Sequence, residues 1–262
     1  MLVPLLESRM RNPIAQKMGN PIVLAALLLS SGPALSDPCA PVAQTGEGVT
    51  VAGTRDDNRL TLADGRVVQI AGLDLASLRL PDLAGEDAVL VSAGPPDRHG
   101  AVHAGLYVEG ADLALALAGQ GKARVRPAPG EEACYGQLMT AEDNARKARL
   151  GLWADPGYAV ADAAVPESVS RHADAFAILT GRVQHIGMTK ATVWIDFGKV
   201  WREDVTLAVP RRQWPRFEAA GLTRAALAGN VIRARGVVTM RDGPRIDITE
   251  PVAIERVASD RD

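Results

Sequence analysis

The 262-residue sequence is poor in the residues that build metal centres, and its net charge is small. Cysteine occurs twice and histidine four times, at scattered positions, which is too few for a metal site made of these ligands. Hydrophobic residues make up 47% and charged residues 23% of the chain, the balance of an ordinary globular protein. This composition excludes wholesale disorder and a multispanning membrane protein. The net charge of −2 does not by itself indicate any class of partner.

The N-terminal segment has the order of features of a secretory signal peptide. Basic residues precede the apolar run 22–29, and a small-x-small cleavage site ends at Ser36. We expect residues 1–36 to be removed, leaving a periplasmic or secreted protein with no membrane attachment. The alternative is a single membrane anchor, but Gly32 and Pro33 interrupt the apolar stretch before it reaches the roughly 20 residues that span a bilayer.

The two cysteines, Cys39 and Cys134, both follow the expected cleavage site. An even number of cysteines in an oxidising compartment favours a disulfide between them. Two free, buried thiols are the alternative.

Charge is divided unevenly along the chain. Residues 37–160 hold 11 Lys and Arg against 17 Asp and Glu, a balance of −6, whereas residues 180–262 hold 14 against 10, a balance of +4. A strong phosphate-binding surface is therefore not expected in the first half, whereas the charge of the second half allows one.

Periodicity and turn signals predict two β-rich domains, at residues 37–158 and 180–258. Residues 159–179 have no clear period, and we expect them to form a linker. In the first domain, Asp64-Gly65 predicts a hairpin turn, and Asp112 and Gly121 flank a predicted helix. Further strands and helices are expected over these ranges: strands at 49–52, 59–62, 66–71, 180–186, 191–197, 204–209, 231–240 and 245–249, and helices at 111–120, at 134–150 and between 212 and 227.

Three segments of the first domain, residues 62–78, 97–127 and 134–153, resemble the thermonuclease, or staphylococcal-nuclease-like, family. That family has an Asp-Arg-Tyr-Gly-Arg motif, a strand and a helix closed by Gly-x-Ala, and then Glu-x-x-Ala-Arg, Arg and Gly-Leu-Trp. The residues that carry the likeness are Asp97, Arg98, Gly100, Gly110, Gly121, Ala123, Glu142, Ala145, Arg146, Arg149 and Gly151-Leu152-Trp153.

The resemblance implies a mainly β fold with helices, of the α+β class, built on a five-stranded OB-type barrel. In active members of the family it also implies calcium-assisted cleavage of phosphodiesters. Carboxylates hold the cation, a glutamate helps to activate water, and two arginines stabilise the charge that develops on the phosphate.

Most of the family's active-site residues are replaced in this chain. The ligating Asp falls on Asn58, the two catalytic arginines on Gln69 and Ala101, the catalytic Glu on Ser77, and the phosphate-contacting Tyr on His99, whereas Asp74 keeps its metal-ligand identity. We therefore predict a catalytically inactive domain with no catalytic residues and, apart from Asp74 as a residual candidate, no metal ligands. The alternative is a residual calcium-dependent nuclease in which Arg79 or Arg98 replaces a lost guanidinium and His99 acts as a base. His99 and His103 as structural or solvated side chains are the simpler interpretation.

The second domain resembles a small OB-like β-barrel. Strand alternation places Trp194 on a polar face and predicts that Arg233, Arg235 and Arg245 point outward. Arginines beside an exposed aromatic residue suit the binding of single-stranded nucleic acid. A solvated face whose tryptophan is covered is the other interpretation, and Trp201 and Trp214 are expected to be core or rim residues.

The sequence thus predicts an exported, non-catalytic binding or scaffold module of the cell envelope. Its ligand is either single-stranded nucleic acid, bound through the C-terminal domain, or an envelope protein. Calcium is expected only under the nuclease alternative, and a protein-interaction module with no nucleic-acid role is the third hypothesis.

Overall fold

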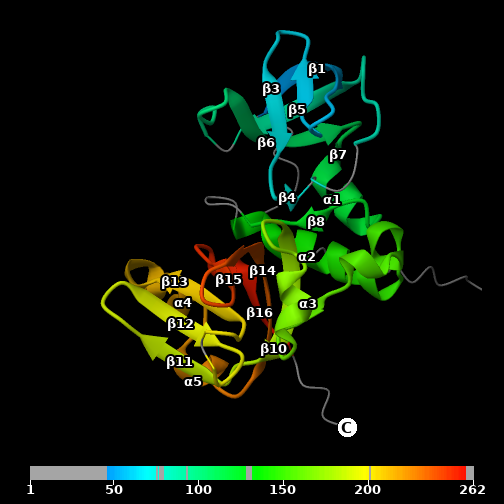
Figure 1. The fold of residues 1–262 in the computed structure, drawn as a ribbon. Coiled ribbons are helices and arrows are strands. Elements are labelled where there is room, and N and C mark those ends of the chain that lie inside the picture. The colour runs from blue at the N-terminus through cyan, green and yellow to red at the C-terminus, as the bar shows by residue number, and fades with distance from the viewer. Residues whose placement is uncertain are drawn as a thin grey trace, which may run out of the picture. The chain divides into compact units, whose positions relative to one another are not determined.

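The computed structural model describes residues 46–74, 76, 80–92, 94–127, 132–200 and 202–257. Within them the fold is mainly β with a few helices, as expected (Figure 1). The expected signal peptide, Cys39, Ser77, Arg79 and Trp201 lie outside the described residues, as does the side chain of Cys134. The expected disulfide therefore stays a prediction. Within the described ranges, no helix combines the length and the apolar character needed to cross a membrane.

Five strands of the first domain close into a barrel. Strand β1 pairs with β2 and β5, β2 pairs with β3, β5 pairs with β6, and β3 closes the ring by parallel pairing with β6. The Asp64-Gly65 turn joins β2 to β3 as predicted, with Gly65 at a φ of 87° that suits glycine. The strands are β1 (Glu47–Thr54), β2 (Leu60–Leu62), β3 (Val67–Ile70), β5 (Asp87–Ser92) and β6 (Ala101–Val108).

The rest of the first domain consists of helices and short strands. Asp112 caps the first helix as predicted, because its Oδ1 accepts a hydrogen bond from the Leu115 amide at 3.1 Å. Leu117 and Leu138, one from each of the two helices, are buried in the same core as the barrel strands. The elements are β4 (Leu73–Asp74), β7 (Ala111–Asp112), α1 (Leu113–Gly119), β8 (Arg124–Val125), α2 (Glu132–Lys147), and the 3-10 helices η1 (Gly151–Ala154) and η2 (Pro156–Tyr158).

The strands of the second domain form one continuous sheet. Their order is β11-β12-β13-β15-β14-β10, and β10 leads directly into β11. Between these two strands, the Val183 amide bonds to Asn230 and the Gln184 amide bonds to Asp196, so the chain passes from one side of the sheet to the other. This connectivity suits an OB-type barrel. The strands are β10 (Phe176–Arg182), β11 (His185–Met188), β12 (Thr192–Asp196), β13 (Thr206–Pro210), β14 (Val231–Met240), β15 (Pro244–Asp247) and β16 (Ile254–Arg256).

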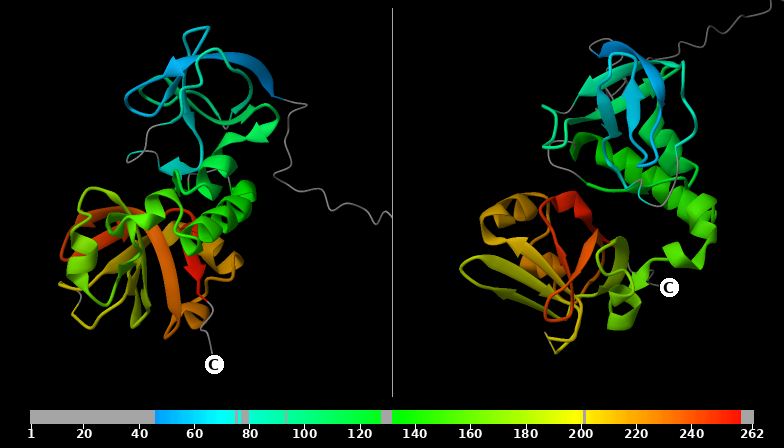
Figure 2. Two further views of the ribbon diagram at one scale, coloured as in Figure 1. Left: turned by 90° about the vertical axis from the view of Figure 1, so that its right-hand side faces the viewer. Right: turned by 45° about the horizontal axis from the view of Figure 1, so that its top comes forward.

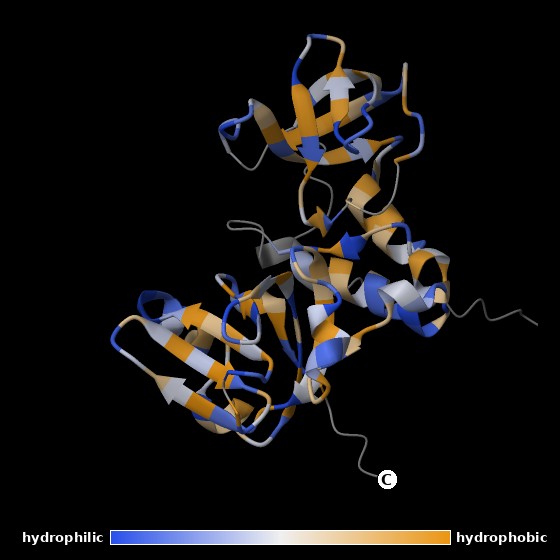
Figure 3. Cartoon of the chain, in the orientation of Figure 1, coloured by the Kyte–Doolittle hydropathy of each residue, from blue (hydrophilic) through white to orange (hydrophobic). Residues whose placement is uncertain are grey.

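One 3-10 helix and two short α-helices connect β13 to β14, in the region where a helical piece was expected. Trp214 is buried and stacks on Phe217, with ring centroids 5.9 Å apart, so this tryptophan is a core residue as predicted. Apolar and polar residues alternate along the strands (Figure 3), and the views in Figure 2 show how the strands of each domain curve. The helical elements are η3 (Arg211–Gln213), α4 (Trp214–Ala219), α5 (Arg224–Leu227) and η4 (Pro251–Ala253).

The segment 159–179, expected to be a linker, has regular structure. It contains β9 (Ala161–Asp162), which pairs in parallel with β10, and α3 (Pro166–Ser170). Ala161, Val169 and Leu179 are fully buried in the core of the second domain. Because β9 pairs locally over only two residues and α3 is a short helix, neither leaves a period in the sequence. The segment belongs structurally to the second domain.

Candidate functional site

Three of the predicted active-site positions meet in the first barrel. Asn58, Gln69 and Asp74 line a cavity of about 160 Å³ together with Arg59 and Arg126. They come from three different parts of the chain: the turn between β1 and β2, strand β3 and strand β4. The alignment with the family therefore identified residues that lie together in space.

The side chain of Asn58 accepts a hydrogen bond from the protein backbone. The residue is buried, its φ is 59°, and its Oδ1 accepts a hydrogen bond from the Leu80 amide at 3.1 Å. Asparagine is one of the few residues other than glycine that adopt this left-handed conformation readily. The side-chain oxygen at the family's ligand position thus links the β1–β2 turn to the backbone at Leu80.

Asp74 is buried in an ion pair. The side chain is 3% exposed, and its Oδ2 accepts a hydrogen bond from Nη2 of Arg124 at 2.8 Å. The two residues lie opposite each other in the β4–β8 pair. The Arg124 guanidinium in turn lies 5.3 Å from the ring centroid of Tyr158 and 5.0 Å from that of Phe176, where aromatic faces stabilise a cation. The one retained carboxylate is therefore neutralised by a guanidinium.

Gln69 contacts a neighbouring arginine. Its Oε1 accepts a hydrogen bond from Nε of Arg59 at 3.3 Å, and Nη1 of Arg59 donates to Asp57 at 3.0 Å. Slight burial raises the pKa of Asp57, but hydrogen bonds from Arg59 and Arg55 outweigh it and lower the pKa below the ordinary value. Asp57 and Arg59 thus neutralise each other at the cavity.

His99 and Ala101 do not line this cavity. Both backbone amides donate to Oδ1 of Asp97, at 2.8 and 3.0 Å, and these bonds lower the pKa of Asp97. Nε of Arg98 lies 3.0 Å from Nε2 of His99. The two residues proposed to replace lost catalytic groups thus contact each other in the turn before β6. Among the described residues, no group of three or more His, Cys, Asp or Glu side chains is placed to hold a metal ion.

In the second domain, Trp194 and Arg245 line a common cavity of about 460 Å³. The Arg245 guanidinium lies 5.9 Å from the centroid of the Trp194 ring, and its Nη2 donates to Asp247 at 3.1 Å. The predicted alternation is correct here, because Val193 and Ile195 are fully buried while Trp194 is only partly covered.

Sequence reasoning missed several residues of this second cavity, among them His185, Asp196, Arg241 and Asp242. Asp196 accepts a hydrogen bond from Oγ1 of Thr206 at 3.0 Å, and its other oxygen lies 3.2 Å from Nδ1 of His185. The alternation that placed Trp194 on the outer face also places Asp196 there, so the sequence contained a signal that could have identified Asp196. Arg241 and Asp242 lie in the turn between β14 and β15. Strand periodicity does not predict where the side chains of a turn point.

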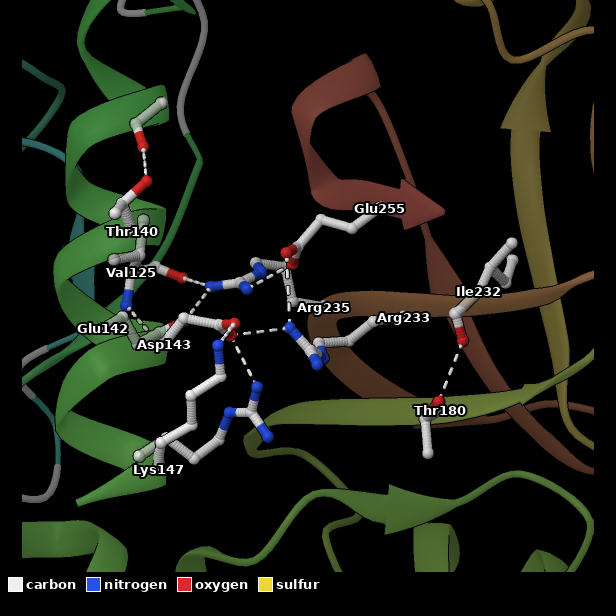
Figure 4. Close-up of polar contacts among 12 residues, drawn as sticks. Val125, Thr140, Glu142, Asp143, Lys147, Thr180, Ile232, Arg233, Arg235 and Glu255 are labelled. Atoms are coloured by element: carbon white, nitrogen blue, oxygen red, sulfur yellow. Dashed lines mark hydrogen bonds and ion pairs between the residues drawn. The ribbon is translucent and has the colours of Figure 1, made fainter. Parts of the chain in front are cut away.

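Arg233 and Arg235 were predicted to point outward into solvent, and this prediction is wrong, because both side chains are largely covered. Arg235 is 2% exposed: its Nη1 donates to Oε2 of Glu142 at 2.6 Å and to the Val125 carbonyl at 3.1 Å. Nη1 of Arg233 donates to Asp143 at 2.8 Å, and Glu255 contacts both arginines (Figure 4). The side chains do leave the barrel core, as alternation requires, but carboxylates of α2 and β16 meet them.

The comparison with known families agrees with the geometry of the first domain. Residues 75–155 match the family described as staphylococcal nuclease homologue. No curated protein matches the chain significantly. The matched segment includes the strands β5 and β6, both helices α1 and α2, and the Gly-Leu-Trp motif in η1. Together with the closed five-stranded barrel, this match shows that the first domain is similar to staphylococcal nuclease homologues.

Proposed function

We propose that the protein is an exported, non-catalytic member of the thermonuclease-like group that binds a ligand through its second barrel. The observation that carries the first part is the buried Asp74–Arg124 pair. Calcium binding at Asp74 requires a carboxylate that is free to face the ion, and here Oδ2 of that carboxylate already accepts a hydrogen bond from the buried Arg124 guanidinium. Displacing it would leave a buried cation without its counter-ion, at a cost of several kcal/mol.

The replaced arginines support the same conclusion. Gln69 and Ala101 carry no charge, and Ala101 is buried in the barrel. One group that stabilises developing charge in a transition state contributes about 3–4 kcal/mol, or roughly a hundred- to a thousandfold in rate. The loss of two such groups lowers catalysis by several orders of magnitude even where substrate still binds.

The binding part of the proposal rests on the cavity beside Trp194. A partly exposed tryptophan next to a guanidinium provides a stacking surface for a base of single-stranded nucleic acid. Of the four residues first considered for this role, Trp194 and Arg245 lie together at the cavity, whereas Arg233 and Arg235 are occupied by carboxylates. The proposed nucleic-acid contact is therefore limited to the Trp194 face. An envelope protein as the partner is the competing proposal.

A digestion assay separates the catalytic alternatives. Purified mature protein is incubated with single- and double-stranded DNA and RNA in calcium or in chelator, beside the Asp74→Ala variant. We expect no cleavage in any sample. Calcium-dependent turnover that disappears in Asp74→Ala would establish the residual nuclease instead, and activity equal in both proteins and in chelator would indicate a contaminating nuclease.

A titration tests the binding part. Labelled single-stranded oligonucleotides are added to the full mature chain and to Trp194→Ala, and binding is followed by fluorescence anisotropy. We expect binding that weakens in the variant. If the parent shows no binding at low salt, a protein partner becomes the better proposal.

A further inference from the structure

Small residues flank Trp194 on both neighbouring strands. In register, Trp194 of β12 lies opposite Gly187 of β11 and opposite Ala208 of β13. Directly opposed residues on one face of a sheet are the ones that normally cover an aromatic side chain. Here the side chain of Gly187 is a hydrogen atom and that of Ala208 is a methyl group, and both are too small to cover the tryptophan ring. The hollow beside the tryptophan is thus built into the register of three strands.

Gly187 in particular keeps this space open. A Cβ atom placed on Gly187 would lie 3.9 Å from Cβ of Trp194 and 3.3 Å from Cε1 of His185. Its backbone is not in the left-handed region that demands glycine. A larger residue could therefore be accommodated by the backbone, and its side chain would project into the cavity.

The polar groups around the hollow include donors and acceptors left for a ligand. Both carboxylate oxygens of Asp196 are engaged, one by Thr206 and one by Nδ1 of His185, so Nε2 of the His185 ring remains to bond outward. Within the described ranges, the guanidinium of Arg241 and the carboxylate of Asp242 have no hydrogen-bond or ion-pair partner. The cavity can therefore both donate to and accept from the edge of a planar ring.

The charged residues at this site do not form a continuous basic surface that could bind several phosphates. Two arginines and two aspartates line the cavity, so their formal charges cancel. Arg245 is further paired with Asp247. Arg241 alone is a lining cation without a partner among the described residues, which limits the expected phosphate contacts to about one.

Resting on the proposed function, we infer that the hollow beside Trp194 is a site for one nucleobase, recognised by stacking and by its polar edge. The cavity volume of about 460 Å³ falls within the usual range for small-molecule sites. The other described aromatic residues of this barrel, Phe176, Phe197, Trp214 and Phe217, are buried. One partly exposed ring stacks one base. The base belongs either to a free nucleoside or nucleotide or to one residue of a strand.

The experiment compares ligands that share the base and differ in phosphate. The full mature chain is titrated by calorimetry with nucleosides, 5′-mononucleotides, and short and long homo-oligonucleotides, at about 50 and about 200 mM salt. We expect a nucleoside to bind and to compete with the oligonucleotides. The apparent affinity should rise with strand length only in proportion to the number of bases that can occupy the site. The slope of log affinity against log salt should be no steeper than about −0.7, the value for one phosphate contact on a single strand.

Two variants test the hollow itself. Trp194→Ala should weaken nucleoside binding roughly 5- to 150-fold, the range for losing one stacked base. Gly187→Leu keeps the tryptophan but fills the space beside its ring and presses on the His185 ring, which lies 3.3 Å from the built Cβ, and it should weaken binding about tenfold or more. The matched control is Gly53→Leu in β1 of the other barrel, where a built Cβ meets nothing within 4 Å. It should bind as the parent does.

The outcomes separate this inference from the proposed function. Oligonucleotide binding without nucleoside binding, a salt slope steeper than about −2, or full binding by Gly187→Leu would overturn the one-base site and leave the binding module in place. If the nucleoside binds and oligonucleotides do not, the natural ligand is a free nucleoside or nucleotide. If a base in a strand binds as tightly as the free nucleoside, the ligand is nucleic acid. Both results support the one-base site. Calcium-dependent cleavage would overturn only the non-catalytic proposal.

Discussion

Replacing Arg235 by methionine should destabilise the protein strongly and in a pH-dependent way. Methionine keeps an unbranched apolar side chain of adaptable shape at the position. It leaves Glu142, which is 2% exposed, without the guanidinium that lies 2.6 Å from its Oε2. Breaking a buried ion pair by removing one partner typically costs about 3–5 kcal/mol. We expect a loss of this size in the free energy of unfolding at neutral pH.

The pH dependence follows from Glu142. Burial raises the pKa of Glu142 above its ordinary value, and Arg235 together with the Val125 amide opposes that increase. Without Arg235 the pKa of the folded state rises further. A carboxyl group whose pKa is higher in the folded than in the unfolded state contributes stability at low pH, and this is lost as the pH rises through the folded pKa. The variant's deficit relative to the parent should therefore be smaller near pH 5 than near pH 7.5.

Urea unfolding followed by circular dichroism at these two pH values measures the effect. Arg233→Met, two residues away on β14, is the matched control. Its partners Asp143 and Glu255 are 31% and 27% exposed, and each such solvated pair contributes about 0–1 kcal/mol. Adding Glu142→Gln to Arg235→Met removes the stranded charge and keeps an acceptor for the Val125 amide, so it should recover most of the loss. If Arg235→Met costs no more than Arg233→Met, or costs the same at both pH values, the reasoning is wrong.

Three further predictions concern other parts of the chain. Asp74→Asn should cost about 3 kcal/mol or more in urea unfolding because Arg124 loses its buried counter-ion, and calcium should not raise the melting temperature of the parent; a calcium-dependent increase would refute the structural role of Asp74. Mass spectrometry without reduction should find Cys39 linked to Cys134, and two alkylatable thiols would contradict this. N-terminal sequencing of the exported protein should begin after Ser36, and an intact N-terminus in a membrane fraction would indicate an anchor.

The first barrel was largely predictable from the sequence because its signals are local. The Asp64-Gly65 turn and the Asp112 cap depend on conformations that few residues adopt, so short stretches identify them. Closure of the five strands does not follow from such signals. It came from the family resemblance, which also assembled Asn58, Gln69 and Asp74 at one cavity.

The partners of the predicted site residues could not be predicted in the same way. Asp74 and Arg124 are 50 positions apart in the sequence, and no period relates them. Strand alternation in β14 correctly buried Ile232 and Ala234 and directed Arg235 away from the core. It carries no information about what lies on the other face of the sheet, and a helix 93 positions earlier supplies the carboxylate there.

This also changes the interpretation of the charge difference between the two halves. The balance of −6 in residues 37–160 and of +4 in residues 180–262 suggested a basic surface open to phosphates. Two of the basic residues, Arg233 and Arg235, are instead paired with Glu142 and Asp143 of the acidic half. Because an arginine that is already neutralised displaces no counterions from nucleic acid, these two add nothing to a phosphate-binding surface. Part of the opposite charge of the halves therefore serves their contact with each other, and the nucleic-acid proposal depends on the tryptophan rather than on the charge.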